Sequence, residues 1–406
     1  MRFCLALILL FSPFLLLAQG GTITGTVARM DNKTKLAKAS VFLSNSSYGT
    51  SANEDGSFTL SNVKPGQYEL VVSMVGFEDF NQTIMVGKDE IRIKAELLPK
   101  ITQLHEVVIT TPANWKKNYE MFVKAFLGES ENAKKCKILN PHEVTMIYHK
   151  AKETLEAWSD DFIEIENRAL GYKVKFMLKS FNNDYINNIV SWEGKVLYTE
   201  LPGNAAQKKI WEAKRNDIYY GSAMHFFRSL QTAKLNDEGF LVMTLVRKPN
   251  PQRPPEALIQ KKLAKFQYAE LTRANVDSTN HWREVYNLPK YNETLIRQPL
   301  KETDIARATD QAGVFLISFP QYLYVMYTKK REDVFFKDIY HPLDMPNYQT
   351  SVITLYKPYA LFDMNGSVIS SQSTLFEGTW SKDKVAELLP IDYVPGEMVI
   401  KDDLKY

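Results

Sequence analysis

Short apolar runs separated by turn residues occupy the chain from Gly25 to Phe77, and this spacing limits the possible fold more than any other feature. Asp55-Gly56 provides a tight turn, and Lys64-Pro65-Gly66 provides another, in which Pro fixes φ and Gly accepts a positive φ. The runs between the turns alternate apolar and polar residues, as half-buried strands do. Short strands at this spacing predict a small all-β sandwich over residues 22–99.

Six runs in this segment are the expected strands of the sandwich. They are Thr22–Arg29, Ser40–Leu43, Ser57–Leu60, Tyr68–Val72, Thr83–Val86 and Ile91–Leu97. With their turns they resemble the carboxypeptidase regulatory-like domain, a transthyretin-like sandwich found at the start of many Bacteroidetes envelope proteins. The resemblance implies a spacer or binding scaffold and leaves the rest of the chain uncharacterised.

The first residues have the features of an export signal. Arg2 precedes an apolar run from Leu5 to Leu17, and the small residue Ala18 follows, so we predict a signal peptide over residues 1–18. The run is shorter than the roughly 20 residues that a membrane-spanning helix needs, and no later run of that length is free of charges. We therefore expect an exported protein without a transmembrane helix in the mature chain, in the periplasm or associated with the outer membrane.

The charge balance argues against nucleic acid as a partner. Lysine and arginine total 50 and aspartate and glutamate total 47, a formal net charge of +3. A nearly neutral chain lacks the basic surface that binds phosphates. Aromatic residues make up 12% of the chain, which suits β-structure and is compatible with a contact surface.

A second resemblance concerns the segment that follows the sandwich. Leu104–Thr111, with Val107 and Val108 at its centre, is similar to the strand that follows this sandwich in TonB-dependent outer-membrane transporters. In that family the strand pairs with a partner protein, which implies a linker strand over 100–114 here. The remaining chain is too short for a transporter barrel. A role as an outer-membrane transporter-associated protein is therefore one alternative function.

The larger region, 115–406, predicts an α+β fold dominated by antiparallel sheet. Trp115 to Cys136 has the apolar spacing of a helix, and Asn204 to Leu235 is a second helical region. Between them we expect strands, including a hairpin that turns at Glu193-Gly194. A proline-rich connector near 249–256 marks a subdivision of this region.

Ser222 and His225 form the best local constellation for catalysis. They lie three apart on the predicted helix and could act as a nucleophile and its base. Catalytic serines usually stand on a strained turn, however, and the chain has no Gly-x-Ser-x-Gly motif. We favour a packed helix, with Tyr219 in the core and Arg215 and Arg228 paired with sheet carboxylates.

His281 and Glu284 match the His-x-x-Glu motif of the zinc carboxypeptidases that give the sandwich its name. The third ligand would have to be His341. The sequence separation between His281 and His341 is shorter than the corresponding separation in those enzymes. The domain order is also reversed, because the sandwich follows the catalytic domain in that family. We therefore predict no metal and no cofactor, and the name of the module is not transferred as an activity.

Glu164 and Glu166 share one face of a predicted strand. Paired carboxylates could do acid–base chemistry, but they could equally pair with Arg215 or Arg228. We prefer a structural ion-pair lock between the helix and the sheet.

The sequence thus predicts a multidomain, exported envelope protein without catalysis of its own. The sandwich would be a binding or scaffold module, and the larger region would present an aromatic-rich surface to a protein or glycan. The main alternative is a hydrolase acting on peptide or glycan through Ser222 and His225 or through His281 and Glu284.

Overall fold

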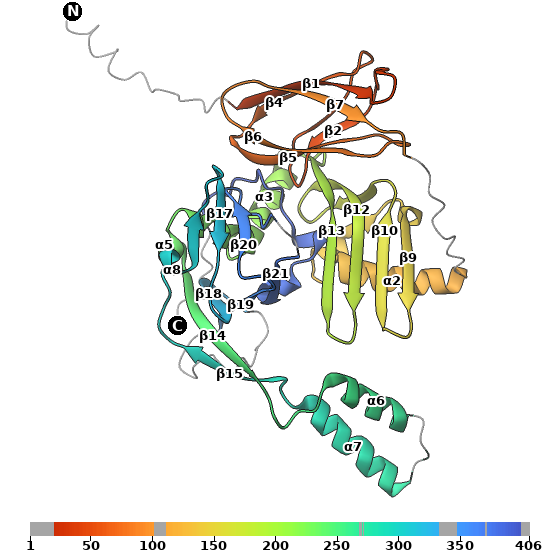
Figure 1. Ribbon diagram of the computed structural model, residues 1–406, viewed down its shortest axis with the longest axis vertical. Coiled ribbons are helices and arrows are strands. Elements are labelled where there is room, and N and C mark those ends of the chain that lie inside the picture. The colour runs from red at the N-terminus through yellow and green to blue at the C-terminus, as the bar shows by residue number, and fades with distance from the viewer. Residues whose placement is uncertain are drawn as a thin grey trace, which may run out of the picture.

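The computed structural model describes residues 20–100, 111–267, 270, 272–332, 347–369 and 372–398. A β-sandwich lies across one end of a larger region that contains two broad sheets side by side, and a helical hairpin projects from the opposite end (Figure 1). The fold class expected from the sequence is confirmed, since an N-terminal sandwich precedes a larger α+β region dominated by antiparallel sheet.

The sandwich consists of a three-stranded sheet in the order β4-β1-β7 and a four-stranded sheet in the order β3-β2-β5-β6. Its strands are β1 (Gly21–Arg29), β2 (Ser40–Leu43), β3 (Gly49–Ser51), β4 (Ser57–Val63), β5 (Gly66–Ser73), β6 (Phe80–Val86) and β7 (Ile91–Leu97). The six predicted strands are confirmed, and β1 and β7 pair in parallel. Ile23, Val41 and Leu70 are fully buried between the sheets.

The first sheet of the larger region has six strands and one covering helix. They are α2 (Pro112–Phe126), β8 (Cys136–Ile138), β9 (Val144–His149), β10 (Thr154–Ser159), β11 (Ile163–Asn167), β12 (Tyr172–Asp184) and β13 (Ile189–Glu200), with short 3₁₀ turns at Ala133–Lys135 and Pro141–Glu143. Phe122 and Phe126 of α2 pack edge-on against Phe181, with ring centroids 5.0 and 6.0 Å apart. These aromatic contacts join the helix to the sheet.

Two predictions for this part need correction. The first predicted helix is present, but it starts at Pro112, inside the expected linker strand of 100–114, and ends at Phe126 instead of Cys136. It begins early because Thr111 caps it, and it ends early because Gly128 adopts a φ of 97° that no helix continues through. Residues 101–110 of the expected linker lie outside the described residues.

The predicted turn at Glu193-Gly194 is also wrong, because both residues lie within the single long strand β13. The reversal between β12 and β13 occurs earlier, after Asp184, whose Oδ1 accepts hydrogen bonds from the backbone N–H groups of Ile186 and Asn187 at 2.9 and 3.0 Å. Such an Asx turn fixes a chain reversal locally.

Helices α3 (Ala205–Tyr219), α4 (Ala223–Gln231) and α5 (Leu235–Glu238) follow β13. Asn204 and Gln207 form a capping box at the start of α3. The second helical region is therefore broken at Tyr220–Ser222 rather than continuous.

The second half of the larger region contains a five-stranded and a three-stranded antiparallel sheet. Their strands are β14 (Phe240–Pro249), β15 (Tyr291–Ile296), β18 (Tyr322–Arg331), β19 (Tyr348–Leu355) and β21 (Thr374–Gly378), then β16 (Ala306–Ala308), β17 (Val314–Ile317) and β20 (Ala360–Asp363). The short helix α8 (Glu302–Ile305) and 3₁₀ turns at Thr379–Lys382 and Val385–Glu387 connect them. Phe226 and Phe227 of α4 are buried in the core of this half, beside Phe240 and Phe362.

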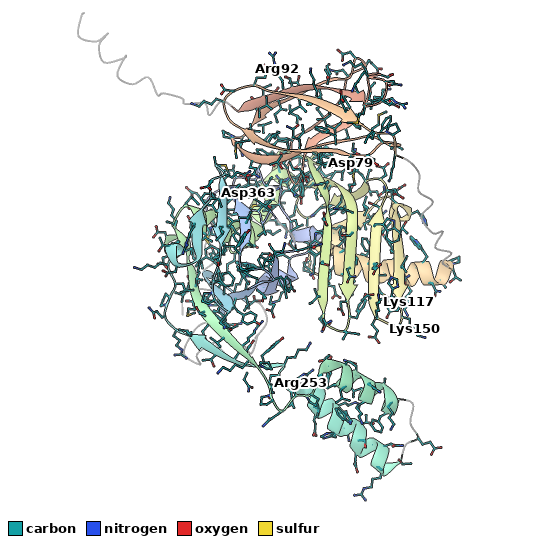
Figure 2. The ribbon with its side chains drawn as sticks, in the orientation of Figure 1. Asp79, Arg92, Lys117, Lys150, Arg253 and Asp363 are labelled. Atoms are coloured by element: carbon teal, nitrogen blue, oxygen red, sulfur yellow. The ribbon has the colours of Figure 1, made fainter. Side chains whose placement is uncertain are left out.

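A helical hairpin interrupts the connection between the paired strands β14 and β15. Helices α6 (Glu256–Gln267) and α7 (Arg273–Asn287) form it, and neither was predicted from the sequence. Arg253 holds the base of the hairpin, because its Nη1 donates to the carbonyls of Val285 and Leu288 and its Nη2 to Glu256 at 2.7 Å (Figure 2). The proline-rich connector is the loop between β14 and α6.

The sandwich meets the larger region at the outer edge of β13. The N–H of Asn45 donates to the carbonyl of Val196 at 2.7 Å, and the N–H of Tyr198 donates to the carbonyl of Ser46 at 3.0 Å. The turn after β2 thus adds a short parallel bridge to β13, at Leu197. Such backbone pairing extends the sheet into the neighbouring domain.

A late segment of the chain, residues 389–396, completes this contact, and we call it the strap. The N–H of Ile391 donates to the carbonyl of Asn45 at 2.7 Å, and its side chain is buried in the sandwich core. The carboxylate of Asp392 accepts a hydrogen bond from the N–H of Ser47 at 2.8 Å, and Lys64 donates to the carbonyl of Asp392 at 2.8 Å. We call the β13 bridge and the strap together the joint.

Candidate functional site

Ser222 is the N-cap of α4, and its hydroxyl is used to start that helix. Its Oγ accepts a hydrogen bond from the backbone N–H of His225 at 3.2 Å and donates one to the carbonyl of Tyr219 at 2.7 Å. The contact between Ser222 and His225 is therefore with the backbone of His225 and not with its imidazole. This geometry does not activate Ser222 as a nucleophile.

The imidazole of His225 has a partner at each ring nitrogen. Its Nδ1 accepts from the N–H of Gly221 at 3.1 Å, and its Nε2 lies 3.1 Å from the carboxylate of Glu238. The neutral tautomer that fits these partners carries its proton on Nε2. Burial lowers the pKa of His225 to about 4, although Glu238 acts in the opposite direction. His225 is therefore a buried, neutral side chain that packs against Phe240 and Tyr327.

His281 and Glu284 lie on the exposed surface of α7, in the projecting hairpin. The expected third ligand, His341, lies outside the described residues. No cluster of three or more His, Cys, Asp or Glu side chains able to hold a metal occurs within the described ranges.

The predicted ion-pair lock is wrong in its pairing. Glu164 pairs with Lys173 at 2.9 Å, and Glu166 pairs with Arg168. Both partners lie on the same sheet or the turn beside it, where Glu164 and Glu166 face lysines of β12 across the strand pair.

Arg215 instead reaches Glu200 at the end of β13, with Nη1 and Oε1 2.6 Å apart. Its Nε donates to the carbonyl of Leu170 at 2.8 Å, and its guanidinium lies 3.8 Å from the ring centroid of Tyr172. Arg215 is therefore a buried link between α3 and the first sheet.

Arg228 binds backbone carbonyls rather than a carboxylate. Its three nitrogens donate to the carbonyls of Asn365, Tyr393 and Ile391 at 2.9, 3.0 and 2.7 Å. Two of these acceptors belong to the strap, and Asn365 itself donates to the carbonyl of Gln67 in the sandwich at 2.9 Å. Arg228 thus holds the joint from inside the larger region, and Tyr219 packs beneath its guanidinium at 5.4 Å.

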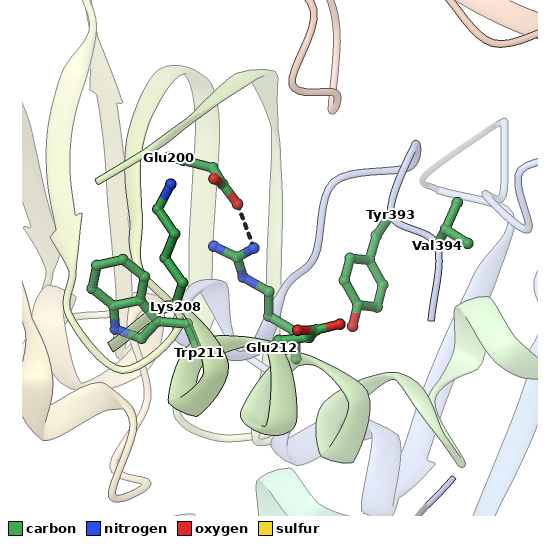
Figure 3. Close-up of a pocket in the computed structure, with 7 residues that line it drawn as sticks. Glu200, Lys208, Trp211, Glu212, Tyr393 and Val394 are labelled. Carbon is green, nitrogen blue, oxygen red and sulfur yellow. Dashed lines mark hydrogen bonds and ion pairs between the residues drawn. The ribbon is translucent and has the colours of Figure 1, made fainter. Parts of the chain in front are cut away.

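A pocket of about 230 Å³ opens next to the joint, between α3, the end of β13 and the strap (Figure 3). It is lined by Glu200, Lys208, Trp211, Glu212, Arg215, Tyr393 and Val394. The rings of Trp211 and Tyr393 stand on opposite sides of it (Figure 3), and Arg215 and Glu200 of its lining form an ion pair. We name it the α3 pocket.

The helix α3 supplies most of this lining from one face. Lys208, Trp211, Glu212 and Arg215 recur at the three- and four-residue spacing of a helix face. Within the described residues, neither Lys208 nor Glu212 has a hydrogen-bonded or ion-paired side chain. Arg215 was predicted from the sequence as an ion-pairing residue, but Lys208, Trp211 and Glu212 were not recognised with it as one site. Their helical spacing was the available signal.

Trp211 is fixed in its position by the chain around it. Its Nε1 donates to the carbonyl of Arg168 at 3.1 Å. The indole lies against Gly171, where a Cβ would come within 2.1 Å of the ring, and against Gly203, where it would come within 2.6 Å. Gly171 also has a φ of 70°, which only glycine adopts without strain.

Val107 and Val108 lie outside the described residues, so the transporter-associated role stays a prediction. Among the described helices, none combines the length and the apolar character needed to cross a membrane.

Comparison with known families identifies the N-terminal module. Residues 23–109 match the family of the CarboxypepD_reg-like domain. No curated protein matches the chain. The match confirms the resemblance inferred from the turns and strands, for that part of the chain.

Solved structures show weak similarity to the chain. GBS52, the minor pilin of Streptococcus agalactiae, is 14% identical with a TM-score of 0.19, over 22% of this chain and 48% of the pilin. A membrane-associated protein of unknown function from Bacteroides fragilis is 12% identical with a TM-score of 0.17, over 88% of this chain and 93% of its own. A protein from Bacteroides uniformis that is described as carbohydrate binding is 8% identical with a TM-score of 0.18, over 38% of this chain and 57% of its own. The chain spans about half the length of the first structures it matches, and these scores are too low to transfer a function.

Proposed function

We propose that this chain, which begins with a carboxypeptidase regulatory-like domain, is an exported, non-catalytic binding protein of the cell envelope. The sandwich is its scaffold, and the α3 pocket in the larger region is its contact site for a protein or glycan. One observation supports this most strongly. The hydroxyl of Ser222 and both ring nitrogens of His225 are used inside the fold, whereas Lys208 and Glu212 point at an open pocket with no side-chain partner among the described residues.

The joint supports the scaffold role. Backbone hydrogen bonds, the strap and Arg228 fix the sandwich against the strand whose last residue, Glu200, lines the pocket. A spacer on a flexible linker would not need these contacts, because relative domain motion is the default when an interface is small. The sandwich therefore stabilises the edge from which the pocket is built.

An assay of purified residues 20–406 tests the non-catalytic part of this proposal. We expect no turnover of casein, of p-nitrophenyl esters or of p-nitrophenyl glycosides above that of the Ser222→Ala and His281→Ala variants. Turnover that one of these variants abolishes would support the hydrolase alternative instead. Zinc bound in stoichiometric amount and lost with His281→Ala would also contradict the proposal.

Fractionation of cells that express the full chain tests the location. We expect the protein in the periplasmic or outer-membrane fraction, and deletion of residues 2–17 should retain it in the cytoplasm. A full-length chain that stays in the cytoplasm would contradict an envelope role.

A further inference from the structure

We propose that the α3 pocket binds the terminal ring of a neutral oligosaccharide. This inference rests on the proposed binding function and names the class of ligand at the same site. It follows from the aromatic walls of the pocket, its unpaired polar groups, its balanced charge and its size.

The indole of Trp211 provides a rigid apolar wall. The hydrogen bond from its Nε1 to the carbonyl of Arg168 and the close approach of Gly171 and Gly203 fix the ring before any ligand arrives. A preorganised side chain loses little entropy on binding. The flat C–H face of a pyranose stacks on such a ring, because an aromatic surface removes apolar area from water and offers a weakly negative face to C–H groups.

Tyr393 stands on the other side of the pocket (Figure 3). Its hydroxyl donates to the side-chain oxygen of Asn216 at 2.7 Å, which fixes the ring. Burial, with a further contribution from Glu212, raises the pKa of Tyr393 to about 12, so it stays protonated at neutral pH. This hydrogen bond holds the second aromatic wall in place.

Lys208 and Glu212 supply the complementary polar groups. An ammonium is only a donor and a carboxylate is only an acceptor, whereas a sugar hydroxyl does both. In Figure 3, Lys208 points along the Glu200 side of the pocket and Glu212 toward Tyr393, so the two groups stand apart around the middle. Hydroxyls at separate positions of one ring can therefore engage the two groups with charge-assisted hydrogen bonds.

The balance of charges favours an uncharged ligand. The lining contains two cations, Lys208 and Arg215, and two carboxylates, Glu200 and Glu212. An acidic sugar or a phosphate would meet two carboxylates, and an amine would meet two cations, so neither gains from the local field. A neutral polyhydroxyl ligand meets no such repulsion.

The volume of the pocket limits the ligand to one ring. At about 230 Å³ it is smaller than the pockets of about 300–1,000 Å³ that enclose drug-sized ligands. A stable protein partner would need about 800 Å² of surface on each side, far more than the walls of this pocket offer. One terminal sugar with its chain leading into solvent fits this space.

Isothermal titration calorimetry on residues 20–406 tests the proposal. The probes are maltotriose, cellotriose, xylotriose, mannotriose and chitotriose as neutral sugars, with 3′-sialyllactose as the acidic one. We expect at least one neutral sugar to bind, and Lys208→Ala and Glu212→Ala each to weaken its affinity about tenfold or more. Lys209→Ala, a neighbouring exposed lysine that does not line the pocket, should change the affinity less than about twofold.

Several outcomes would overturn the inference. They are the absence of binding by every neutral probe, stronger binding of 3′-sialyllactose, or affinities that both pocket variants leave unchanged. If the chain captures a partner protein and Glu212→Ala abolishes that capture, the binding function is supported and the sugar is the wrong class of ligand. Hydrolysis of a bound oligosaccharide would support a sugar as the ligand and would contradict the proposal that the protein is non-catalytic.

Discussion

The joint and the α3 pocket are adjacent, and they use polar residues in opposite ways. At the joint, Arg228 and Asp392 are surrounded by partners that the chain itself provides. In the pocket, Lys208 and Glu212 extend from a helix without any side-chain partner in the part of the chain that the structure describes. Satisfied polar groups stabilise a fold, and unsatisfied exposed ones are available to a ligand. The difference separates a structural contact from a binding site.

Removing the centre of the joint should have the largest effect. Arg228→Ala deletes three hydrogen bonds and leaves three carbonyls without their donor, which should lower the free energy of unfolding by about 4 kcal/mol. Urea unfolding followed by circular dichroism measures this. Arg92→Ala is the matched control, because Arg92 is exposed on the sandwich (Figure 2) and, among the described residues, its side chain pairs with Glu90 alone. It should cost no more than about 0.5 kcal/mol. Equal losses in the two variants would remove the distinction between joint and surface.

Gly171→Ala should have the next largest effect, because its new methyl group would collide with the indole of Trp211, which forms one wall of the pocket. The new Cβ combines a φ of 70° with a contact 2.1 Å from Trp211, so we expect a loss of about 3 kcal/mol. Gly76→Ala separates the two causes, since Gly76 has a φ of 85° but nothing within 4 Å. Its loss should be about 1 kcal/mol. Tryptophan fluorescence should shift only in Gly171→Ala, and an unshifted spectrum there would contradict the rigid indole.

The pH dependence of stability should show a smaller effect at His225. Burial lowers its pKa to about 4 in the folded chain, below the value of 6.5 when unfolded. Between those values the unfolded state binds the proton more readily, so this group contributes stability above pH 6.5 that is lost as the pH falls toward 4. The slope is at most about 1.4 kcal/mol per pH unit.

The difference between wild type and His225→Gln isolates this contribution from the carboxylates that titrate in the same range. Unfolding free energies at pH 5 and pH 7 should differ more in wild type than in the variant. The same difference in both proteins would show that His225 is not buried as a neutral group.

The pocket variants should have the smallest effect on stability. Lys208→Ala and Glu212→Ala remove exposed side chains that make no hydrogen bond to another side chain in the described ranges, so each should change the free energy of unfolding by less than about 0.5 kcal/mol. Thermal unfolding compares them with Arg228→Ala. A loss of 2 kcal/mol or more in either variant would show that the residue stabilises the fold, as the residues of the joint do.

The sandwich could be predicted because its signals are local. Asp55-Gly56 and Lys64-Pro65-Gly66 set the turns, and the alternation of each strand lies within a few residues. The late closing contact of Ile391 with its core carries no such signal, because that partner lies more than three hundred residues away.

The same argument explains what was missed in the larger region. The predicted pairing of Arg215 with a sheet carboxylate is confirmed, but the partner is Glu200 rather than Glu164 or Glu166, and Arg228 binds three carbonyls instead of a carboxylate. Helix α7 is amphipathic, but it carries few apolar residues and buries none, so the sequence offered no run of core residues to mark it as a helix. The pocket combines one helix face, which periodicity can show, with Glu200 and Tyr393, which only the tertiary structure brings there.

The position of the strap in the sequence also sets the order in which the molecule can be assembled. The sandwich has all its strands once residue 97 has been synthesised, but two of the three acceptors of Arg228 are supplied by residues 391 and 393. A chain synthesised from its N-terminus therefore completes the strap only after the sandwich and the sheets of the larger region have emerged. Truncation before residue 391 should remove the strap and two of the three acceptors of Arg228, while the backbone bridge between the sandwich and β13 remains.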